Sequence, residues 1–380
     1  MKKIIFGAMA AAALLACSKE QVLEKNQAGN EISYSIQTDN QTKASAVYCQ
    51  NFLMENFTVY ATYKNTTVNK WYYSDKISDK GTSWEGTTTR YWSADGTHDF
   101  YAIVNGEMTR GADPTTVPTV VDFTPEAVVA NQMDLLYAVA FDKSRADQTV
   151  TLNFRHALSQ VEFRAKNTNE KLHVIISGVT VGQVPSTGTF TYPTEESNDQ
   201  FVDHDQVKTN GAETGTWALK DTKTDYSVAI SDLPIVKNAN NTPVDLTISK
   251  DINDNTRDFK KSMLLLPTSS ITGGNGTTAW TPAAGETEYD GSYLAVNCQI
   301  YNIEGAEFNP GSDVILHNGW AYIPVSFNWE PGKKYIYTFV FGDGNGGYNE
   351  NGDPVLAPVS YQIHVDDFDL VSDTDINMQQ

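Results

Sequence analysis

Short stretches in which polar and apolar residues alternate recur along the chain, and they constrain its fold more than any other feature. The alternation is clear in NFTVYATY (56–63), TVTLNF (149–154) and PVDLTIS (243–249). This pattern is typical of strands with one buried face. No long stretch keeps a 3.6-residue period with helix caps, so we expect few and short helices. The short strands and the turns between them predict an all-β protein built from antiparallel β-sandwiches.

Length and composition suggest two domains. The chain has 380 residues, of which 40% are apolar, so it is long for one ordinary core and apolar enough to form real ones. A charged segment, FDKSRADQ (141–148), separates two strand-rich halves. We therefore predict two β-sandwich domains in tandem, over residues 30–146 and 147–380.

The charge of the chain argues against a nucleic-acid partner. The net charge is −20, from 47 acidic and 27 basic residues. A surface with this excess of acid repels a phosphate backbone. The acidic residues are spread along the chain rather than gathered in a tail, so we interpret them as a solubilising surface.

The first residues have the pattern of an export signal. Two lysines precede an apolar stretch, residues 4–16, that is too short to span a bilayer. The segment Leu14–Cys17 resembles a bacterial lipobox, which implies a lipoprotein signal peptide over residues 1–16 and lipidation of Cys17. Residues 17–29 are polar and form the tether between lipid and fold. The alternative is an ordinary secretory signal with a chance cysteine.

Two further cysteines are present, Cys49 and Cys298. An exported protein can hold a disulfide, and the sequence leaves open whether these two residues pair. Cys298 lies on the apolar face of SYLAVNCQIY (292–301), which favours a buried free thiol.

The sequence carries no motif of a common enzyme class. It has no GxSxG, no HExxH, no phosphate-binding loop and no dinucleotide fingerprint after a strand. The six histidines are scattered singly, without metal-ligand spacing. In the loop GDGNGGYNENGDP (342–354), Gly347 and Pro354 stand where a calcium loop needs oxygen ligands. We therefore expect no catalysis, no metal site and no cofactor.

Two aromatic clusters, KWYYSDK (70–76) and TRYWSADG (89–96), have two interpretations. Their rings could stack on sugars, as in a cell-surface lipoprotein that binds glycans. They could also be core residues or cross-strand pairs, which need no ligand. We favour the second interpretation.

The first alternating segment after the tether is followed by a polar hinge. Ile32, Tyr34 and Ile36 alternate with polar residues, and residues 38–42 contain no apolar side chain before the single base Lys43. Burying three such side chains contributes roughly 5–9 kcal/mol, a large part of the roughly 5–15 kcal/mol by which whole domains are stable.

A second alternating segment stands near the C-terminus. Its apolar residues are Val359, Tyr361, Ile363 and Val365. Two acidic residues then interrupt, and Phe368 and Leu370 continue in the opposite phase. This slip of one residue predicts a bulge or a crossing from one sheet to another.

Several longer segments together carry a family resemblance. They are LNFRHALSQVEFRAKN (152–167), GVTVGQVPSTGTFTYP (178–193), WEPGKKYIYTFVFGDGNGG (329–347) and APVSYQIHVDDF (357–368). With the lipobox at Cys17 and the hinge, they resemble the fimbrillin family, lipoprotein pilins of Gram-negative bacteria that build type V pili. The resemblance implies two transthyretin-like β-sandwich domains. It also implies an outer-membrane lipoprotein precursor that later joins other pilin subunits in a cell-surface fimbrium.

The resemblance further implies a route of assembly. A trypsin-like protease cuts after a basic residue in the hinge, and Lys43 matches that position, where the better-known members carry Arg. The three apolar residues of the first segment are then the displaced strand, and the four of the C-terminal segment are the donor strand. This hypothesis expects residues 30–37 to fill a sheet edge, and a place between two other strands counts against it. The alternative is a permanent first strand, with Lys43 as an exposed loop residue.

Overall fold

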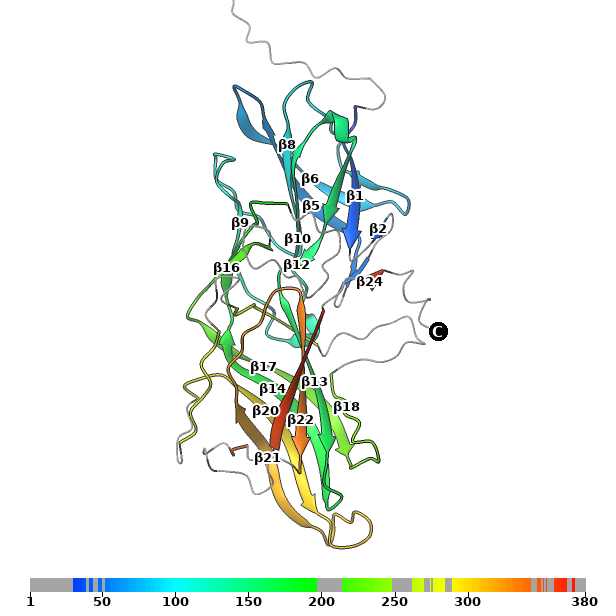
Figure 1. The fold of residues 1–380 in the computed structure, drawn as a ribbon, viewed down its shortest axis with the longest axis vertical. Helices are drawn as coiled ribbons and strands as arrows, with labels where there is room; N and C mark the ends of the chain where they lie inside the picture. Colours follow the sequence, from blue (N-terminus) through cyan, green and yellow to red (C-terminus); the bar gives the residue numbers. More distant parts are fainter. Residues whose placement is uncertain are drawn as a thin grey trace, which may run out of the picture.

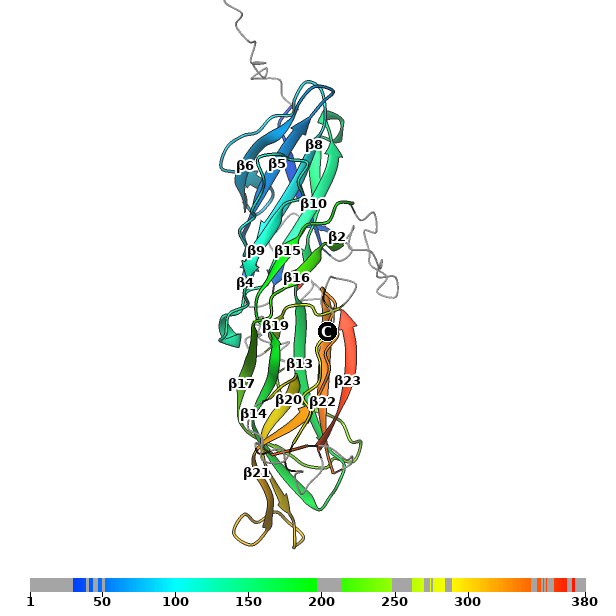
Figure 2. The same cartoon turned by 90° about the vertical axis from the view of Figure 1, so that its left-hand side faces the viewer.

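The structure is a computed structural model in which most of the chain after the tether is described. The described residues are 30–38, 41–43, 47–49, 52–196, 214–247, 262–269, 274, 276–283, 289–342, 347–349, 351, 353, 359–367 and 371–372. For residues 37–38, 41–43, 47–49, 52–53, 364–367 and 371–372 the description covers the backbone alone. Figures 1 and 2 show an elongated molecule, with the N-terminal strands at one end and the last long strands at the other.

The N-terminal end is built from one sheet that has nine strands in the described part of the chain. Its order is β11-β1-β7-β6-β5-β8-β10-β12, and β2 pairs with β1. The strands are β1 (Ser33–Thr38), β2 (Gln41–Lys43), β5 (Asn56–Lys64), β6 (Asn69–Asp79), β7 (Trp84–Gly86), β8 (His98–Val104), β10 (Leu136–Lys143), β11 (Thr149–Asn153) and β12 (Arg155–His156).

This sheet folds over on itself around a single core. Leu152 on β11 and Ala138 on β10 lie near opposite ends of the strand order, yet both belong to the same buried cluster as Val59 and Phe100. Alternate residues of a strand point to one face, so each strand contributes every second side chain to this core. The two ends of one sheet thus pack against each other as the layers of a sandwich do.

A second, smaller sheet covers the outer face of β8 and β10. In sheet order its strands are β16 (Thr216–Leu219), β15 (Gly188–Thr191) and β9 (Thr119–Phe123). Phe190 and Trp217 from this sheet pack with Tyr101 of β8 and Tyr137 of β10 in a second buried cluster. The Trp217 Nε1–H also donates to the carbonyl of Ala157, at 2.8 Å.

The C-terminal end is a two-layer sandwich. One layer contains β18 (Val244–Asp245), β13 (Ser159–Asn167), β22 (Lys333–Phe341) and β23 (Val359–Asp367), in this order, with β19 (Met263–Leu265) also paired to β13. The other contains β17 (Lys223–Ile235), β14 (Leu172–Pro185), β20 (Tyr293–Asn302) and β21 (Val314–Pro324). Phe163 and Phe339 of the first layer share one buried cluster with Val179 and Val296 of the second.

Short elements complete the described part of the chain. A small sheet joins β24 (Val371–Ser372), β3 (Val47–Cys49) and β4 (Phe52–Met54). Two 3₁₀-helices of three residues each, η1 (Val129–Asn131) and η2 (Arg145–Asp147), stand between strands. Within the described ranges no helix is long and apolar enough to cross a membrane.

The all-β class and the sandwich packing are confirmed, and the pairing adds a feature that the sequence did not predict. Two strand pairs are parallel, β1 with β11 and β13 with β22. The other described pairs of strands, such as β5 with β6, are antiparallel, as expected.

The predicted division at residue 146 does not separate the sheets. β11 and β12 follow that residue but pair with β1 and β10, and β15 pairs back with β9. The first sheet therefore continues past residue 146. The number and limits of independently folding domains stay a prediction.

Candidate functional site

Strand β1 and the residue just before it bury the three side chains that the sequence assigns to one inner face. Ile32, Tyr34 and Ile36 all belong to the core of the first sheet. The Tyr34 ring meets the rings of Phe57 and Phe100 nearly edge-on, with 6.3 Å between centroids in each pair. This T-shaped geometry is favourable for aromatic pairs.

The hydroxyl of Tyr34 reaches a polar cluster inside this core. It lies 2.5 Å from the Tyr73 hydroxyl on β6. The guanidinium of Arg90 lies over the Tyr73 ring, 4.8 Å from its centroid, and its Nε is 3.7 Å from an Asp75 carboxylate oxygen. Burial raises the pKa of Tyr34 and of Tyr73 well above the usual range. Both phenols therefore stay protonated and share one hydrogen bond in a place with little water.

The outer face of β1 is matched to β11 by hydroxyl groups. Ser33 Oγ lies 2.7 Å from Thr149 Oγ1, and Ser35 Oγ lies 3.0 Å from Thr151 Oγ1. These contacts follow the strand register, in which Ser33 is opposite Thr149 and Ser35 is opposite Thr151. The side chains of both faces thus define the register of whatever strand lies here.

Strand β1 lies between neighbours and not at a sheet edge, so the predicted edge position is wrong. β11 pairs with it along one side from Ser33 to Gln37. On the other side β2 pairs with its last residues and β7 pairs at Tyr34 alone. The reason is β11, whose Val150 and Leu152 face the same core and therefore bring that strand alongside β1.

The strand is also tied by backbone hydrogen bonds just before its first residue. The Ile32 N–H donates to the carbonyl of Arg90 at 2.9 Å, and the Trp92 N–H donates to the carbonyl of Asn30 at 3.0 Å. If residues 30–43 left this place, the backbone N–H and carbonyl groups of β11 would face those of residues 84 and 90–92 across an empty space. The vacated place is a slot with two sides.

The predicted cut site lies at the end of a hairpin. Two residues separate β1 from β2, which ends at Lys43, and the backbone of Lys43 is paired with that of Ile36. A cut after Lys43 would therefore separate the whole β1–β2 hairpin from the rest of the chain. Whether this bond is cut stays a prediction.

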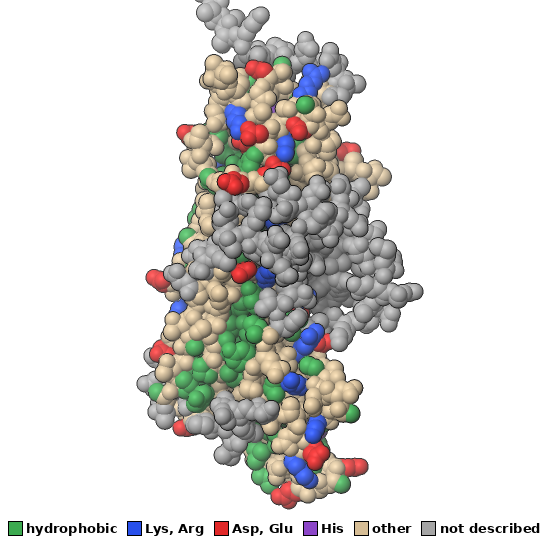
Figure 3. All heavy atoms as spheres, viewed as in Figure 1, with side chains coloured by type: hydrophobic (Ala, Val, Ile, Leu, Met, Phe, Trp, Pro, Cys, Tyr) green, Lys and Arg blue, Asp and Glu red, His purple; other side chains and the backbone are tan. Residues whose placement is uncertain are grey.

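The predicted donor segment forms β23, at the edge of the C-terminal sheet. It pairs with β22 along all nine of its residues. Val359 is fully buried in the sandwich core and Tyr361 packs against that core, whereas Ile363 is 50% exposed. For Val365 only the backbone is described. Figure 3 shows apolar side chains gathered over the lower half of the molecule, the half that contains β23.

The predicted change of phase after β23 coincides with a crossing between sheets. β23 belongs to the C-terminal sandwich, while β24 pairs with β3 in the small sheet. Phe368 and Leu370, on which the prediction rested, lie outside the described residues. The crossing brings the last described strand next to residues 47–48, just after the hinge.

Of the three cysteines, only Cys298 has a described side chain. Cys298 is free and buried, as predicted, and burial raises the pKa of its thiol to about 12. It does not pair with Cys49, whose backbone alone is described. The lipidation candidate Cys17 lies outside the described residues, as do the signal peptide and the tether.

The aromatic clusters are mostly internal. Tyr73 and Trp92 are buried in the first core, and Tyr72 packs against it. Trp71 carries the Arg110 guanidinium 4.6 Å from the centre of its ring and donates its Nε1–H to the carbonyl of Gly111 at 2.8 Å. These contacts agree with the interpretation of the clusters as core and cross-strand residues.

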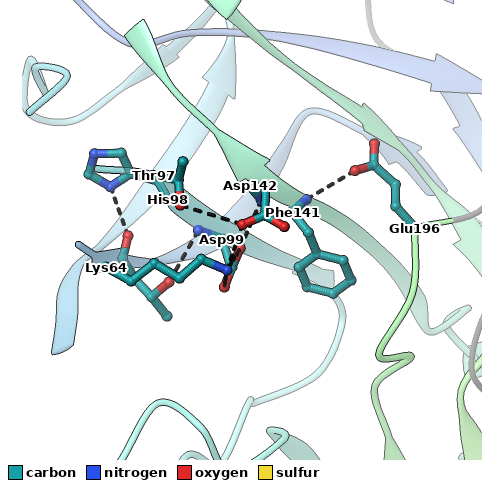
Figure 4. A network of polar contacts seen from close by, with 8 residues as sticks. Lys64, Thr97, His98, Asp99, Phe141, Asp142 and Glu196 are labelled. Atoms are coloured by element: carbon teal, nitrogen blue, oxygen red, sulfur yellow. Dashed lines mark hydrogen bonds and ion pairs between the residues drawn. The ribbon is translucent and has the colours of Figure 1, made fainter. Parts of the chain in front are cut away.

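A polar network joins β5, β8 and β10 (Figure 4). Lys64 Nζ lies 3.4 Å from the Asp99 carboxylate and 2.6 Å from that of Asp142. Glu196 accepts a hydrogen bond from the Phe141 N–H at 3.0 Å. Partial burial opposes the charge of Lys64, but the two carboxylates outweigh it and raise the pKa of this amine. Nowhere in the described residues do three or more His, Cys, Asp or Glu side chains stand close enough to hold a metal. The network serves to join strands.

Sequence reasoning missed the partners of β1. Tyr73, Arg90 and the threonines of β11 stand far from β1 in the sequence. The patterns that contain them, two aromatic clusters and one alternating stretch, do not indicate which strand they contact. The hydroxyl contacts on the outer face left one signal in the sequence. Thr149 and Thr151 alternate with apolar residues just as Ser33 and Ser35 do, but this signal does not say that the two strands pair.

The fimbrillin-like family model matches residues 42–355 of this chain. The chain belongs to the fimbrillin-like family. No curated protein matches it. Among solved structures, a fimbrial protein from Bacteroides vulgatus ATCC 8482 is similar, with 13% identity, 89% of this chain and 99% of that chain covered and a TM-score of 0.57. A fimbrilin from Porphyromonas gingivalis W83 matches at 9% identity over 91% of this chain and 99% of that one, with a TM-score of 0.43. The first likeness shows a shared fold for this fimbrillin-like protein.

Proposed function

We propose that this fimbrillin-like protein is a pilin subunit that assembles by strand exchange. It is exported as an outer-membrane lipoprotein through Cys17, cut after Lys43 by a trypsin-like protease, and joined to other pilin subunits in a cell-surface fimbrium. The family membership supports the fimbrial role, and the geometry of the β1–β2 hairpin supports the route.

One observation carries the route: the segment before Lys43 is a complete hairpin that fills a place in the first core. Its three inner residues contribute about 1.5–3 kcal/mol each on burial. Losing them would remove much of the stability margin of a typical domain. The trimmed subunit would then bind any strand that restores the same apolar side chains and hydrogen bonds.

The position of β1 between neighbours changes what the vacated place offers. With β2 gone as well, the slot has β11 on one side and residues 84 and 90–92 on the other. Backbone groups on both sides need partners, so an incoming strand gains hydrogen bonds along both edges. A slot at one end of the molecule and a donor at the other make a head-to-tail contact, which propagates into a filament.

Limited trypsin treatment of the purified precursor tests this route. We expect loss of about the first 43 residues, followed by ladders of polymer that resist SDS. A trimmed protein that stays monomeric, with clear binding to a glycan array, would instead support a glycan-binding lipoprotein.

The Lys43→Ala variant tests the proposed cut site. We expect normal export and folding, but no maturation by the trypsin-like protease, because the only base of the hinge is gone. N-terminal sequencing of the assembled form is the measurement, and Lys25→Ala in the tether is the matched control, which should mature normally. Unchanged processing of the Lys43→Ala protein would rule out this cut site.

A further inference from the structure

The segment that fills the slot and the segment proposed to replace it are nearly the same sequence. Residues 32–36 read ISYSI and residues 359–363 read VSYQI. Isoleucine and valine differ by one methylene at the first position, while the serine, the tyrosine and the last isoleucine are identical. Only the outward-facing fourth position, with Ser35 in one segment and Gln362 in the other, has side chains of different chemical type.

The tyrosine is the most demanding of these positions. The slot offers two phenylalanine rings in T-shaped contact with the tyrosine ring, and it also offers the Tyr73 hydroxyl. An aliphatic residue would leave both the aromatic space and that hydroxyl unfilled. A phenylalanine would fill the space but leave the buried hydroxyl of Tyr73 without its partner. Tyr361 carries the ring and the hydroxyl that the slot requires.

The serine reinforces the same alignment on the other face. Ser33 contacts Thr149 through its hydroxyl, and Ser360 is the corresponding residue of the C-terminal segment. A shift of two residues would keep the apolar face inward but would place Gln362 opposite Thr149 and move Tyr361 away from Tyr73. Tyrosine and serine together therefore specify one register among those that the alternation allows.

We infer that the donor is β23 of a second copy of this chain, seated so that Val359, Tyr361 and Ile363 take the places of Ile32, Tyr34 and Ile36. The inference rests on the proposed function and adds the partner and the register. The shared order of residues makes the donor run parallel to β11, as β1 does. The Tyr361 hydroxyl takes the hydrogen bond to Tyr73, and the Ser360 hydroxyl takes the contact to Thr149.

Two of the three donor side chains gain burial in the transfer. Ile36 is fully buried in the slot, whereas Ile363 is 50% exposed in its own sheet. Tyr361 is half-buried at the sheet edge, and Tyr34 is 8% exposed. Val359 is already buried, so it gains nothing. The donor therefore covers more of its isoleucine and tyrosine in a neighbour than in its own subunit.

Mixed-subunit cross-linking tests the register. One variant carries Thr149→Cys and another carries Ser360→Cys, both in a Cys49→Ser background. They are mixed, treated with trypsin and oxidised. We expect a disulfide that joins different chains, because the Ser33 hydroxyl that Ser360 would replace lies 2.7 Å from Thr149 Oγ1, so that sulfur atoms at these two positions can meet. The matched control pairs Thr151→Cys with Ser360→Cys and should give little cross-linking.

The outcomes separate the register from the route. Polymers that cross-link through position 151 instead of 149, or through neither, would overturn the register and leave strand exchange standing. Absence of polymer from the unmodified chain under the same treatment would overturn the proposed function itself.

Tyr361→Phe tests the role of the hydroxyl. We expect assembly in competition with the unmodified chain to fall by about tenfold or more, the effect of one unpaired buried hydroxyl. The double variant Val359→Ile, Gln362→Ser, which copies residues 32–36, should assemble as well as the unmodified chain. Equal assembly by Tyr361→Phe would remove the Tyr73 contact from the proposal.

Discussion

At the scale of single residues, one glycine shows how tightly the C-terminal sandwich is packed. Gly182 on β14 is opposite Tyr293 on β20, and the tyrosine ring lies across the glycine backbone. A Cβ added at Gly182 would come within 2.0–2.5 Å of three ring atoms. The ring also carries the hydroxyl that donates to Asp225, at 2.9 Å. The glycine is therefore required by the close approach of an aromatic side chain.

We predict that Gly182→Ala lowers the free energy of unfolding by about 1–3 kcal/mol, because the Tyr293 ring must move. Gly178→Ala on the same strand is the matched control. A Cβ added at Gly178 would lie 3.3 Å from its nearest neighbour, Trp320 Cη2, so we expect a smaller loss of stability. Urea denaturation of the three proteins measures the difference. Equal losses in both variants would show that the ring is not the cause.

At the scale of elements, β1 and β23 carry nearly the same five residues in different surroundings. β1 lies between β11 and β7 with its isoleucine fully buried, and β23 lies at an edge with the matching isoleucine half-exposed. Burial and not composition sets what a side chain contributes to stability. The same residue type should therefore matter for the fold in one strand and for assembly in the other.

We predict that Ile36→Ala lowers the stability of the uncut precursor by about 2–5 kcal/mol, the usual cost of emptying a core site. Ile363→Ala should cost less than about 1 kcal/mol, since half of its side chain is already in water. The polymer formed by the Ile363→Ala protein after trimming should nevertheless be weaker. Denaturation of both precursors and SDS-resistance of both polymers check this. A larger stability loss for Ile363→Ala than for Ile36→Ala would contradict it.

At the scale of the whole molecule, one buried and two half-buried histidines make stability depend on pH. His98 is fully buried and its Nδ1 is hydrogen-bonded to the carbonyl of Thr62, at 2.7 Å. His173 on β14 stacks on Phe308, and His317 lies on β21 of the same sheet. Burial lowers the pKa of all three below the usual histidine value of 6.5.

We predict that stability falls as the pH drops below about 6.5. In that window the unfolded chain takes up protons that the folded chain does not, so each histidine stabilises the fold fully only above the unfolded pKa. Burial raises the pKa of Glu162, which acts in the opposite direction at lower pH. The measurement is therefore the difference in pH dependence between the unmodified chain and His98→Gln, from urea denaturation between about pH 8 and 5.5. Identical slopes would mean that His98 contributes nothing.

For β1 and for the strand that carries Cys298, the side that faces the core was already contained in the sequence. The alternation at 32, 34 and 36 correctly predicted three buried side chains, and the face of Cys298 correctly predicted a buried thiol. The reason is local: successive side chains of a strand point to opposite faces, so a period of two is enough.

Only the tertiary structure decided which strands became neighbours. β11 pairs with β1 although about 116 residues separate their contacts, and this pairing put β1 inside the sheet and not at its edge. The Tyr34–Tyr73 pair also depends on how β6 is placed across the core. Alternation assigns a face but not a partner, because many strands of this chain carry the same period. The pairing is selected only when the apolar faces of all these strands are packed together in one core.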